Sequence, residues 1–579
     1  MTAPRDRSDH PEYAEYPDYP TPDVGSIEGL APFAARAYGD ASAFERPSGA
    51  AVTYRQLAGA VDHVAWLLAP LGGATVALRV ADPCLFAVAF LACARAGCDV
   101  VALAPGQRAA RGVEALRPAA TLDEAGVARA VRDLPGALVP PPALAAMGAE
   151  GSDGRAGLGG EDARDVPGRT GDAPAGCACA AGRAGGGRVV LQSSGTTGEP
   201  KAVVLSRAGI HADMLAGLRK YEFARGARYV SVIPVTHAFG LTCDLLAPLA
   251  TGGTVCVPRD PRAALAELAG FSPTALNVPP AVAEALLRMA RASAGTGGTA
   301  REALRALAGG RLRKMLCGGA GLARQTCAGL RELGVEAFGC YGLTECGPCV
   351  CVNRDRLHKD GSCGVALGCN EVRVSPTGGA PDDPVADAAT GAARDGGRRP
   401  PGRPGEILVR GENVALGTLG PRGELVPLPG VREGGWLRTG DRGSLDRDGF
   451  LWTLGRVDDL IVMPDGTKLD PEPVERELAR CPLIGDAMVF RRGDGLCARL
   501  YVPDPSDAAS AEAFARHLGV DGAARSALGA QDADDADAPA AGVPAHGGAL
   551  PGHVIASVEL CDRPLRRTAT GKLVRQHEA

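Results

Sequence analysis

Apolar residues follow two alternating spacings between Thr53 and Ala104. In Tyr54 to Leu68 they recur at helical spacing, and the short run Thr75 to Arg79 that follows is typical of a strand. A second helical pattern, Leu85 to Ala96, precedes a second strand-like run, Asp99 to Ala104. This alternation of helices and strands predicts a layered α/β domain with mostly parallel strands.

The character of the chain changes after Gly455. Up to that point the α/β alternation continues, with strand-like runs such as Tyr229 to Ile233. Beyond it a charged segment, residues 456–459, leads into one helix, Pro471 to Arg480, and then into strands that begin near Met488 to Phe490. The second pattern predicts a small α+β domain that follows the large α/β domain.

Three stretches rich in Gly, Ala, Asp and Arg carry no periodic pattern. Long surface loops cost little extra conformational entropy, so we expect mobile surface insertions at about residues 145–188, 378–404 and 523–552. The polar N-terminal segment is expected to be a disordered tail. The predicted organisation is a tail at residues 1–23, a large N-terminal domain at 24–455 and a small C-terminal domain at 456–579.

The composition favours a globular protein with more than one domain. A chain of 579 residues is longer than one ordinary core supports, and 45% of the residues are hydrophobic. A formal net charge of −5 does not favour nucleic-acid binding, which usually needs a basic face. The longest apolar stretch, Cys84 to Pro105, contains Arg95 and Asp99, whereas a membrane-spanning helix needs about 20 residues with few or no charges. Since the N-terminal segment lacks the apolar run of a signal peptide, we expect a cytoplasmic protein without a membrane span.

The 18 cysteines are expected to be reduced, because nothing in the sequence indicates export. Four of them, Cys340, Cys346, Cys349 and Cys351, lie close together in the sequence. Their spacing matches no paired zinc knuckle, which disfavours a metal site there.

The segment Leu191 to Lys201 has the composition of a loop that binds phosphate groups. Its glycines permit tight turns that expose backbone N–H groups, while its hydroxyl groups and its lysine add donors and positive charge. The candidate phosphate-binding residues are Ser193, Ser194, Gly195, Thr196, Thr197, Gly198 and Lys201. The segment lacks the Gly-Lys-Ser/Thr ending of the usual P-loop, which disfavours a P-loop hydrolase. The alternative is a polar surface turn.

This loop resembles the signature loop of the adenylate-forming (AMP-binding) superfamily, which includes acyl-CoA synthetases, luciferases and the adenylation domains of peptide synthetases. Four further stretches resemble that superfamily in the same order, at residues 341–345, 439–441, 455–459 and 570–572. The resemblance spans roughly Val52 to Arg575 and is strongest to fatty-acyl and aryl-CoA synthetases. It implies a large AMP-binding domain with a small mobile lid domain, ATP-dependent conversion of a carboxylic acid to acyl-AMP with release of pyrophosphate, and transfer of the acyl group to a thiol.

The resemblance also assigns roles in nucleotide binding. Thr344 is expected to donate to the phosphate that becomes the adenylate, and Glu345 is similar to the family's Mg²⁺-associated carboxylate. An ionised Asp441 suits the two hydroxyls of a ribose, with Arg456 beside it. The residues expected around the adenine are Ala320, Gly339, Cys340 and Tyr341.

Lys572 is the main candidate for catalysis of adenylation. A carboxylate attacks the α-phosphate while pyrophosphate leaves, and a lysine over both groups neutralises the developing charge. Lys572, Thr344, Glu345 and Lys201 form the expected catalytic set. Asp458 aligns with the family's hinge position, which implies that the small domain rotates between the two chemical steps.

The segment Pro234 to Gly240 is similar to the Pro-x-x-His-x-x-Gly segment of acyl and aryl-CoA synthetases. His237 stands where amino-acid-activating domains carry an aspartate for the ammonium group, which argues against an amino acid as substrate. The expected acyl pocket comprises His237, Phe239, Gly318 and Gly319, and its glycines are expected to leave room for a fatty or aryl acid.

Three positions depart from the family pattern. Val462 stands where many members have lysine, and Ala202 replaces a common glycine. The loop from Met463 to Lys468 is longer than in short-chain synthetases, and Lys468 is a weak candidate for a phosphate contact.

The sequence leaves the thiol acceptor open. No segment with a phosphopantetheine serine follows Lys572, so we expect coenzyme A or, as the alternative, the phosphopantetheine of a separate acyl or peptidyl carrier protein. A non-catalytic nucleotide-binding relic is a further alternative. It is disfavoured because Lys572, Glu345 and Lys201 are all present.

Overall fold

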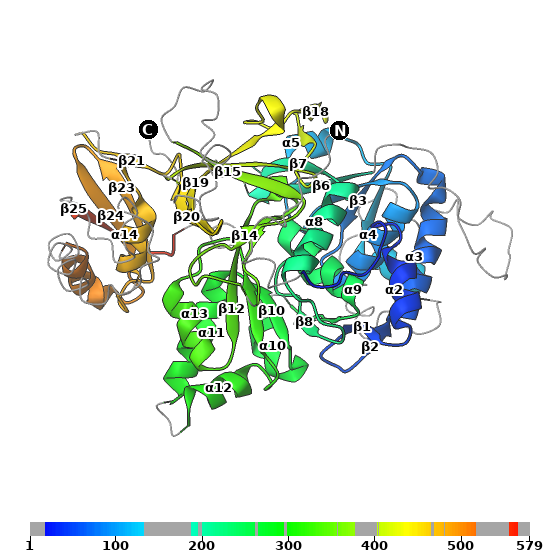
Figure 1. Cartoon of the computed structure of the whole chain (residues 1–579), viewed down its shortest axis with the longest axis horizontal. Helices are drawn as coiled ribbons and strands as arrows, with labels where there is room; N and C mark the ends of the chain where they lie inside the picture. Colours follow the sequence, from blue (N-terminus) through cyan, green and yellow to red (C-terminus); the bar gives the residue numbers. More distant parts are fainter. Residues whose placement is uncertain are drawn as a thin grey trace. The chain divides into compact units, whose positions relative to one another are not determined.

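The computed structural model contains two compact units, and Figure 1 labels its helices and strands. It describes residues 18–132, 187–194, 200–260, 264–294, 298–355, 357–376, 402, 404–464, 468–479, 481–516 and 555–565. The first unit comprises Met1–Gly195, Glu199–Glu371 and Arg410–Leu437, and the second comprises Thr196–Gly198, Val372–Val409 and Arg438–Ala579. The domain boundaries expected from the sequence stay a prediction, and most of the expected tail and insertions lie outside the described residues.

A seven-stranded sheet forms one half of the described part of the first unit. Its strand order is β18-β17-β7-β6-β4-β3-β5. The pairs β3–β4, β3–β5 and β4–β6 are parallel, whereas β6–β7 and the pairs beyond β7 are antiparallel. The strands are β3 Thr75–Arg79, β4 Asp99–Ala102, β5 Ala120–Asp123, β6 Arg188–Ser194, β7 Pro200–Ser206, β17 Gly417–Leu419 and β18 Leu425–Val426.

A nine-stranded sheet in the described residues forms the other half. Its order is β14-β13-β12-β11-β10-β8-β9-β1-β2, with a parallel centre from β12 to β1 and antiparallel strands at both edges. The strands are β1 Ser42–Glu45, β2 Ala51–Thr53, β8 Arg228–Val230, β9 Thr254–Cys256, β10 Ala275–Val278, β11 Lys314–Cys317, β12 Glu336–Gly342, β13 Cys349–Val352 and β14 Val365–Ala366.

Helices pack on both sheets and begin where the sequence supplies caps. Thr53 and Gln56 form a capping box at the start of α3, and Asp82 caps α4, in which every residue from Pro83 to Ala94 is buried. The long apolar stretch is therefore a core helix. The helices are α2 Leu30–Tyr38, α3 Tyr54–Leu68, α4 Pro83–Arg95, α5 Arg111–Ala115, α6 Glu124–Val131, α8 Arg207–Lys220, α9 Ala247–Thr251, α10 Ala264–Phe271, α11 Pro280–Ala294, α12 Ala300–Leu307 and α13 Arg324–Glu332, with 3-10 turns η1 Ala69–Leu71, η6 Thr344–Cys346 and η7 Glu433–Gly435 and the π-helix η4 Gly240–Leu246.

The main apolar core of the nine-stranded sheet lies between its parallel strands and α10 to α13, which Figure 1 shows around β10 and β12. Fully buried members include Leu276, Met315 and Leu330. Burying a side chain of this size contributes about 1.5–3 kcal/mol. This core holds the carboxyl ends of β11 and β12 in fixed register, with Cys317 beside Gly339.

The second unit is built mainly from antiparallel strands. It contains most of a four-stranded sheet in the order β15-β16-β19-β20, a two-stranded sheet of β21 and β22, and a three-stranded sheet of β23, β24 and β25 next to helix α14. Their bounds are β15 Asn370–Pro376, β16 Gly405–Gly411, β19 Leu437–Leu445, β20 Leu451–Arg456, β21 Ile461–Val462, β22 Lys468–Leu469, α14 Pro471–Leu478, β23 Asp486–Arg492, β24 Gly495–Tyr501, η8 Pro505–Asp507 and β25 Ile555–Cys561.

The predicted α/β fold class is confirmed, and the periodic segments fold as expected. The helix at Tyr54–Leu68 and the strand at Thr75–Arg79 match their predicted bounds. In the described part of the chain, the search for helices long and apolar enough to cross a bilayer finds no candidate.

Candidate active site

The predicted phosphate loop is the tip of the β6–β7 hairpin. The strands pair in antiparallel register, with Ser193 opposite Lys201, and Gly195 to Glu199 lie outside the described residues. Val189, Val190 and Leu191 are buried, which fixes the base of β6, whereas Lys201 is exposed. The Gln192 side chain accepts a 2.6 Å hydrogen bond from the Ala110 backbone N–H. The hairpin therefore holds Ser193 and Lys201 as cross-strand neighbours next to the glycine-rich residues.

The Tyr341–Glu345 segment lies beside this hairpin. β12 ends at Gly342, where a Cβ would lie 1.8 Å from the carbonyl oxygen of Pro348, so only glycine fits. The η6 turn follows, with Thr344 buried and Glu345 half-buried. The backbone of Ala415 donates to the carbonyl of Glu345 at 2.8 Å, and the next residue, Leu416, donates to the carbonyl of Val204 on β7 at 2.8 Å. These bonds link the predicted Mg²⁺ carboxylate to the predicted phosphate hairpin.

A buried carboxylate in α8 anchors the residues that follow the η6 turn. Asp213 is 1% exposed and accepts hydrogen bonds from the Cys349 N–H at 3.2 Å and from Asn413 Nδ2 at 2.9 Å. Asn413 Nδ2 also donates to the carbonyls of Cys346 and Cys349. Burial raises the pKa of Asp213 well above its usual range, and the bond from Asn413 opposes that rise.

Sequence reasoning did not identify Asp213 or Asn413. One signal was available, because Asp213 shares a helical face with the buried residues Ile210 and Met214. A carboxylate on an apolar face needs a partner, which makes it a candidate for a structural or functional role. Asn413 carried no comparable signal, since its partners are 64 to 200 residues away in the sequence.

The predicted acyl-pocket residues come together at the carboxyl end of β11. A Cβ at Gly318 would lie 2.8 Å from Cys340 Sγ and 3.2 Å from the Phe239 ring. The space that the sequence analysis expected Gly318 to leave open is therefore bordered closely by these two side chains. His237 is half-buried, and its Nδ1 accepts a 3.3 Å hydrogen bond from the Phe239 N–H. Gly319 adopts a φ of 89°, which favours glycine.

A second buried carboxylate supports the segment that carries His237. Asp244, in the π-helix η4, is fully buried and accepts from Asn277 Nδ2 at 2.9 Å and from the Ile233 N–H at 3.2 Å. Burial raises the pKa of Asp244 to about 7, while these hydrogen bonds act in the opposite direction. π-Helical turns often mark functional sites. The sequence analysis missed Asp244 as well.

The residues predicted around adenine occupy two neighbouring strand ends. Ala320 is exposed just after β11, and the buried Cys340 and Tyr341 lie on β12. The carbonyl of Gly339 accepts a 3.1 Å bond from Asn353 Nδ2, and a Cβ at Gly339 would lie 2.6 Å from the carbonyl oxygen of Ser362. These residues form one edge because β11 and β12 are parallel partners.

In the second unit, the predicted ribose residues form an ion pair. Asp441 on β19 and Arg456 on β20 are cross-strand partners, and Arg456 Nη1 donates to Asp441 Oδ1 at 3.1 Å. Gly440 has a φ of 72°, and a Cβ there would lie 2.7 Å from Arg456 Nη2. Its N–H donates to the buried Glu406, which the sequence analysis also missed.

Asp458 is exposed in the turn after β20. Lys572 lies outside the described residues, as does the side chain of Lys468, so their roles stay predictions.

The described residues contain no group of three or more His, Cys, Asp or Glu side chains placed to hold a metal ion. That finding includes Cys340, Cys346, Cys349 and Cys351, which form no disulfide bonds among the described residues. Mg²⁺ needs no such group, because it binds through one or two carboxylates together with substrate phosphates. The half-buried Glu345 beside the hairpin fits that requirement.

Comparisons with known proteins agree with this arrangement. Residues 188–419 match the family model of the AMP-binding enzymes. A feruloyl-CoA synthase of Amycolatopsis sp is 30% identical over 322 residues, which are 55% of this chain and 57% of that protein. A long-chain-fatty-acid–CoA ligase of Mycobacterium bovis is 26% identical over 356 residues, 55% of this chain and 54% of that protein. The chain thus spans little more than half the length of these curated relatives.

Solved structures resemble the chain over nearly its whole length. An anthranilate CoA ligase in complex with anthranoyl-AMP has a TM-score of 0.63 at 17% identity and covers 96% of both chains. The o-succinylbenzoate CoA synthetase of Bacillus subtilis in complex with ATP and magnesium has a TM-score of 0.60 at 19% identity, over 94% of this chain and 98% of that one. Residues 188–419 therefore match the AMP-binding enzyme family, and the chain has the fold of these CoA ligase structures.

Proposed function

We propose that this chain activates a carboxylic acid with ATP and then transfers the acyl group to the thiol of coenzyme A. One observation carries the proposal: the Thr344–Glu345 turn is tied to strand β7 of the phosphate hairpin through Ala415 and Leu416. The same strand that leads into this turn, β12, contributes Cys340 beside Gly318 and Phe239. The phosphate donors thus lie near one end of the segment from Cys340 to Glu345. The side chains that border the acyl group lie near its other end.

In the first step, an oxygen of the carboxylate attacks the α-phosphorus of ATP, and the bond to pyrophosphate breaks. The donors of the hairpin, with Ser193 and Lys201, hold the phosphates, and hydrogen bonds to charged oxygens contribute about 1.5–3 kcal/mol each. Thr344 donates to the α-phosphate, and Lys572 neutralises charge on the leaving group. Glu345 would hold Mg²⁺ at the triphosphate, where the ion would neutralise charge.

Two groups of residues are proposed to bind the nucleoside. Asp441 accepts hydrogen bonds from the ribose hydroxyls, and Arg456 orients its carboxylate through the 3.1 Å pair. The adenine lies against the edge formed by Ala320 and by Gly339 to Tyr341. In the second step, the thiol attacks the acyl carbon and AMP leaves, after the small domain has turned about Asp458.

The acid is a fatty or aryl acid. His237, Phe239, Gly318 and Gly319 offer no exposed carboxylate for an ammonium group, and Asp244 nearby is committed to Asn277 and Ile233. The relatives support this class, because they include a feruloyl-CoA synthase and a long-chain-fatty-acid–CoA ligase. The cytoplasmic location expected from the sequence stays a prediction.

The test is a panel of acids with ATP and Mg²⁺, ranging from acetate through benzoate and ferulate to long-chain fatty acids. We expect acid-dependent formation of AMP and pyrophosphate, and consumption of coenzyme A in equal amount. If a separate carrier protein is acylated and coenzyme A is not consumed, the acceptor is the carrier protein and the proposed first step still holds. If no acid on the panel produces AMP, the proposal is wrong.

A further inference from the structure

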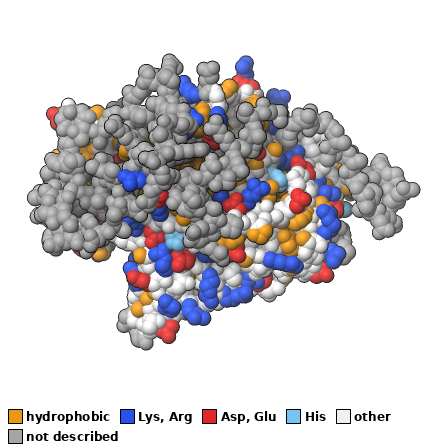
Figure 2. All heavy atoms as spheres, in the orientation of Figure 1, with side chains coloured by type: hydrophobic (Ala, Val, Ile, Leu, Met, Phe, Trp, Pro, Cys, Tyr) orange, Lys and Arg blue, Asp and Glu red, His pale blue; other side chains and the backbone are white. Residues whose placement is uncertain are grey.

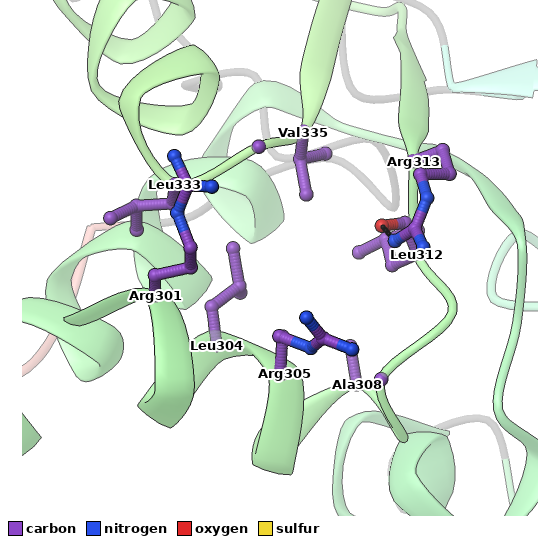
Figure 3. A pocket seen from close by; sticks show the side chains of 10 residues that line it. Arg301, Leu304, Arg305, Ala308, Leu312, Arg313, Leu333 and Val335 are labelled. Atoms are coloured by element: carbon purple, nitrogen blue, oxygen red, sulfur yellow. Dashed lines mark hydrogen bonds between the residues drawn. The ribbon is translucent and has the colours of Figure 1, made fainter. Parts of the chain in front are cut away.

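A small hollow lies in the first unit where α12 and two loops meet. Arg301, Leu304 and Arg305 come from one face of α12, since they are three and four residues apart. The loops that lead into β11 and β12 supply the rest of the lining (Figure 3). The hollow encloses about 270 Å³, just below the usual range of small-molecule pockets.

The hollow has an apolar floor and a cationic rim. Leu304, Leu312 and Val335 are buried and form the floor, with exposed fractions of 2%, 3% and 3%. Arg301, Arg305 and Arg313 are exposed, and Figure 3 shows their side chains placed around the hollow on different sides. In the space-filling view, Lys and Arg side chains gather over the part of the unit that contains α12 (Figure 2).

No carboxylate neutralises this rim within the residues that the structure describes. The nearby carboxylates are committed elsewhere: Glu332 pairs with Arg291, Glu336 pairs with Arg331, and Glu302 caps α12 through Thr299. The rim arginines donate only to backbone carbonyls in this part of the chain: Arg301 Nη2 to Glu332 at 2.7 Å and Arg313 Nη1 to Leu312 at 3.1 Å. Most of their N–H groups are therefore available for an anion.

The hollow is separate from the proposed adenylation site. Arg313 and Val335 precede β11 and β12, whereas Gly318 and the Thr344–Glu345 turn follow the same strands. Parallel strands place these residues at opposite ends of the strands, and the five residue steps from Arg313 to Gly318 span roughly 16 Å at about 3.3 Å each.

We propose that this hollow binds a small organic phosphate, with the phosphate among the three guanidinium groups and an apolar group on the leucine and valine floor. A guanidinium presents a planar pair of N–H donors that matches two phosphate oxygens. A dianionic monoester can satisfy donors from three directions at once, whereas a carboxylate has two oxygens in one plane. The apolar floor explains why an organic ester fits better than inorganic phosphate. This site goes beyond the proposed ligase activity and does not depend on it.

The experiment uses the full chain and phenyl phosphate as the probe, with binding followed by calorimetry in low salt. We expect saturable binding that accounts for one site per chain, at least tenfold tighter than inorganic phosphate or phenol. The Arg305→Glu/Arg313→Glu double variant is expected to lose that site, and Arg305→Lys/Arg313→Lys to bind with intermediate affinity, because lysine keeps the charge without the paired donors. Arg36→Glu, at an exposed arginine near the end of α2, is the matched control and should bind like the unaltered chain.

Binding should also strengthen from pH 5 to pH 7.5, since a phosphate monoester gains its second charge near pH 6 while arginine stays protonated. The inference is overturned if phenyl phosphate does not saturate, or if the double Glu variant binds it with the same affinity and stoichiometry. Because the readout is binding, either result is independent of whether the chain forms an acyl-adenylate.

Discussion

Single buried polar residues set the local geometry of the candidate site. Asp213 and Asp244 are each surrounded by protein, and each accepts bonds from one asparagine side chain and from the backbone. An unpaired buried donor costs about 1–3 kcal/mol. These carboxylates therefore stabilise the observed conformations of the two segments that they contact. Asp213 anchors the residues that follow the η6 turn, and Asp244 anchors the segment that leads to His237.

Replacement of Asp213 by alanine should lower the rate of adenylation at least tenfold. The change leaves Asn413 Nδ2 and the Cys349 N–H without this acceptor, which loosens the turn that positions Thr344 and Glu345. Asp213→Asn should retain most activity, because its side-chain oxygen can still accept both bonds. The measurement is kcat and KM for ATP by pyrophosphate exchange.

Ser206→Ala is the control for general damage to α8, since Ser206 caps that helix through a 2.9 Å bond from the Gly209 N–H. Loss of this cap should cost about 1 kcal/mol of stability and leave kcat unchanged. An unaltered kcat in Asp213→Ala would show that Asp213 does not position the turn.

Asp244 should make the folded state less stable as the pH rises from about 4 to 7. In that range the unfolded chain has lost the proton, because an ordinary aspartate has a pKa near 3.9, whereas the folded chain keeps it up to about pH 7. The free energy of unfolding therefore falls by up to about 1.4 kcal/mol per pH unit from this group. Asp244→Asn removes the titration, so its stability should fall less steeply between pH 4 and 7.

This prediction is checked by the thermal midpoint of unfolding as a function of pH for both chains. Asp40→Asn, at an aspartate whose side chain is 80% exposed, serves as the control and should keep the slope of the unaltered chain. Equal slopes for Asp244→Asn and the unaltered chain would contradict it.

At the scale of elements, the candidate site residues lie together because they occupy the ends of neighbouring strands. β6 and β7 present the hairpin, while β11 and β12 end side by side at Gly318 and Cys340. The segment from Leu191 to Lys201 was predicted to be a loop, but β6 continues to Ser194, because pairing with β7 extends the ladder to the tip. The hydroxyl-rich residues Ser193 and Ser194 thus belong to a strand, which no apolar pattern indicated.

Addition of one methyl group at Gly318 should disturb the acyl wall. In Gly318→Ala the new Cβ meets Cys340 Sγ at 2.8 Å and the Phe239 ring at 3.2 Å, and overpacking of this kind costs about 1–3 kcal/mol. We expect the KM for the acid to rise at least fivefold, with the KM for ATP within twofold of its original value. Steady-state kinetics with the best acid of the panel measures both.

The double variant Gly318→Ala/Cys340→Ala tests whether the contact with the Cys340 sulfur raises the KM for the acid, because removal of the sulfur makes room for the methyl group. It should recover most of the affinity for the acid. An unchanged KM in Gly318→Ala alone would show that this position does not border the acyl group.

At the scale of the whole molecule, the residues of the proposed reaction are far apart in the sequence. The hairpin residue Lys201 belongs to the first unit, whereas Asp441 and Arg456 belong to the second, and Lys572 follows near the end of the chain. The two chemical steps are expected to need different sets of these residues. We expect adenylation to need the charge of Lys572 and transfer to the thiol to proceed without it.

Lys572→Ala should therefore lower the rate of acyl-AMP formation about a hundredfold or more. Transfer from preformed acyl-AMP to coenzyme A should continue at close to the original rate. The loss reflects the missing charge opposite the pyrophosphate group. Pyrophosphate exchange measures the first step, and thioester formation from synthetic acyl-AMP measures the second. Lys220→Ala, at a lysine paired with Asp18, is the control and should leave both steps unchanged. Equal loss of both steps in Lys572→Ala would contradict the assigned role.

The sequence by itself determined the secondary-structure elements of this protein and predicted the kinds of chemistry. Helical and strand periodicities depend on near neighbours, which is why Tyr54–Leu68 and Thr75–Arg79 were predicted with the observed bounds. The phosphate loop and the Thr344–Glu345 segment were likewise recognisable, since their residue types act within a few positions. Only the tertiary structure decided which of these residues meet. Asp213 lies 200 residues before its partner Asn413, and their contact depends on packing between distant elements, which no local pattern along the chain encodes.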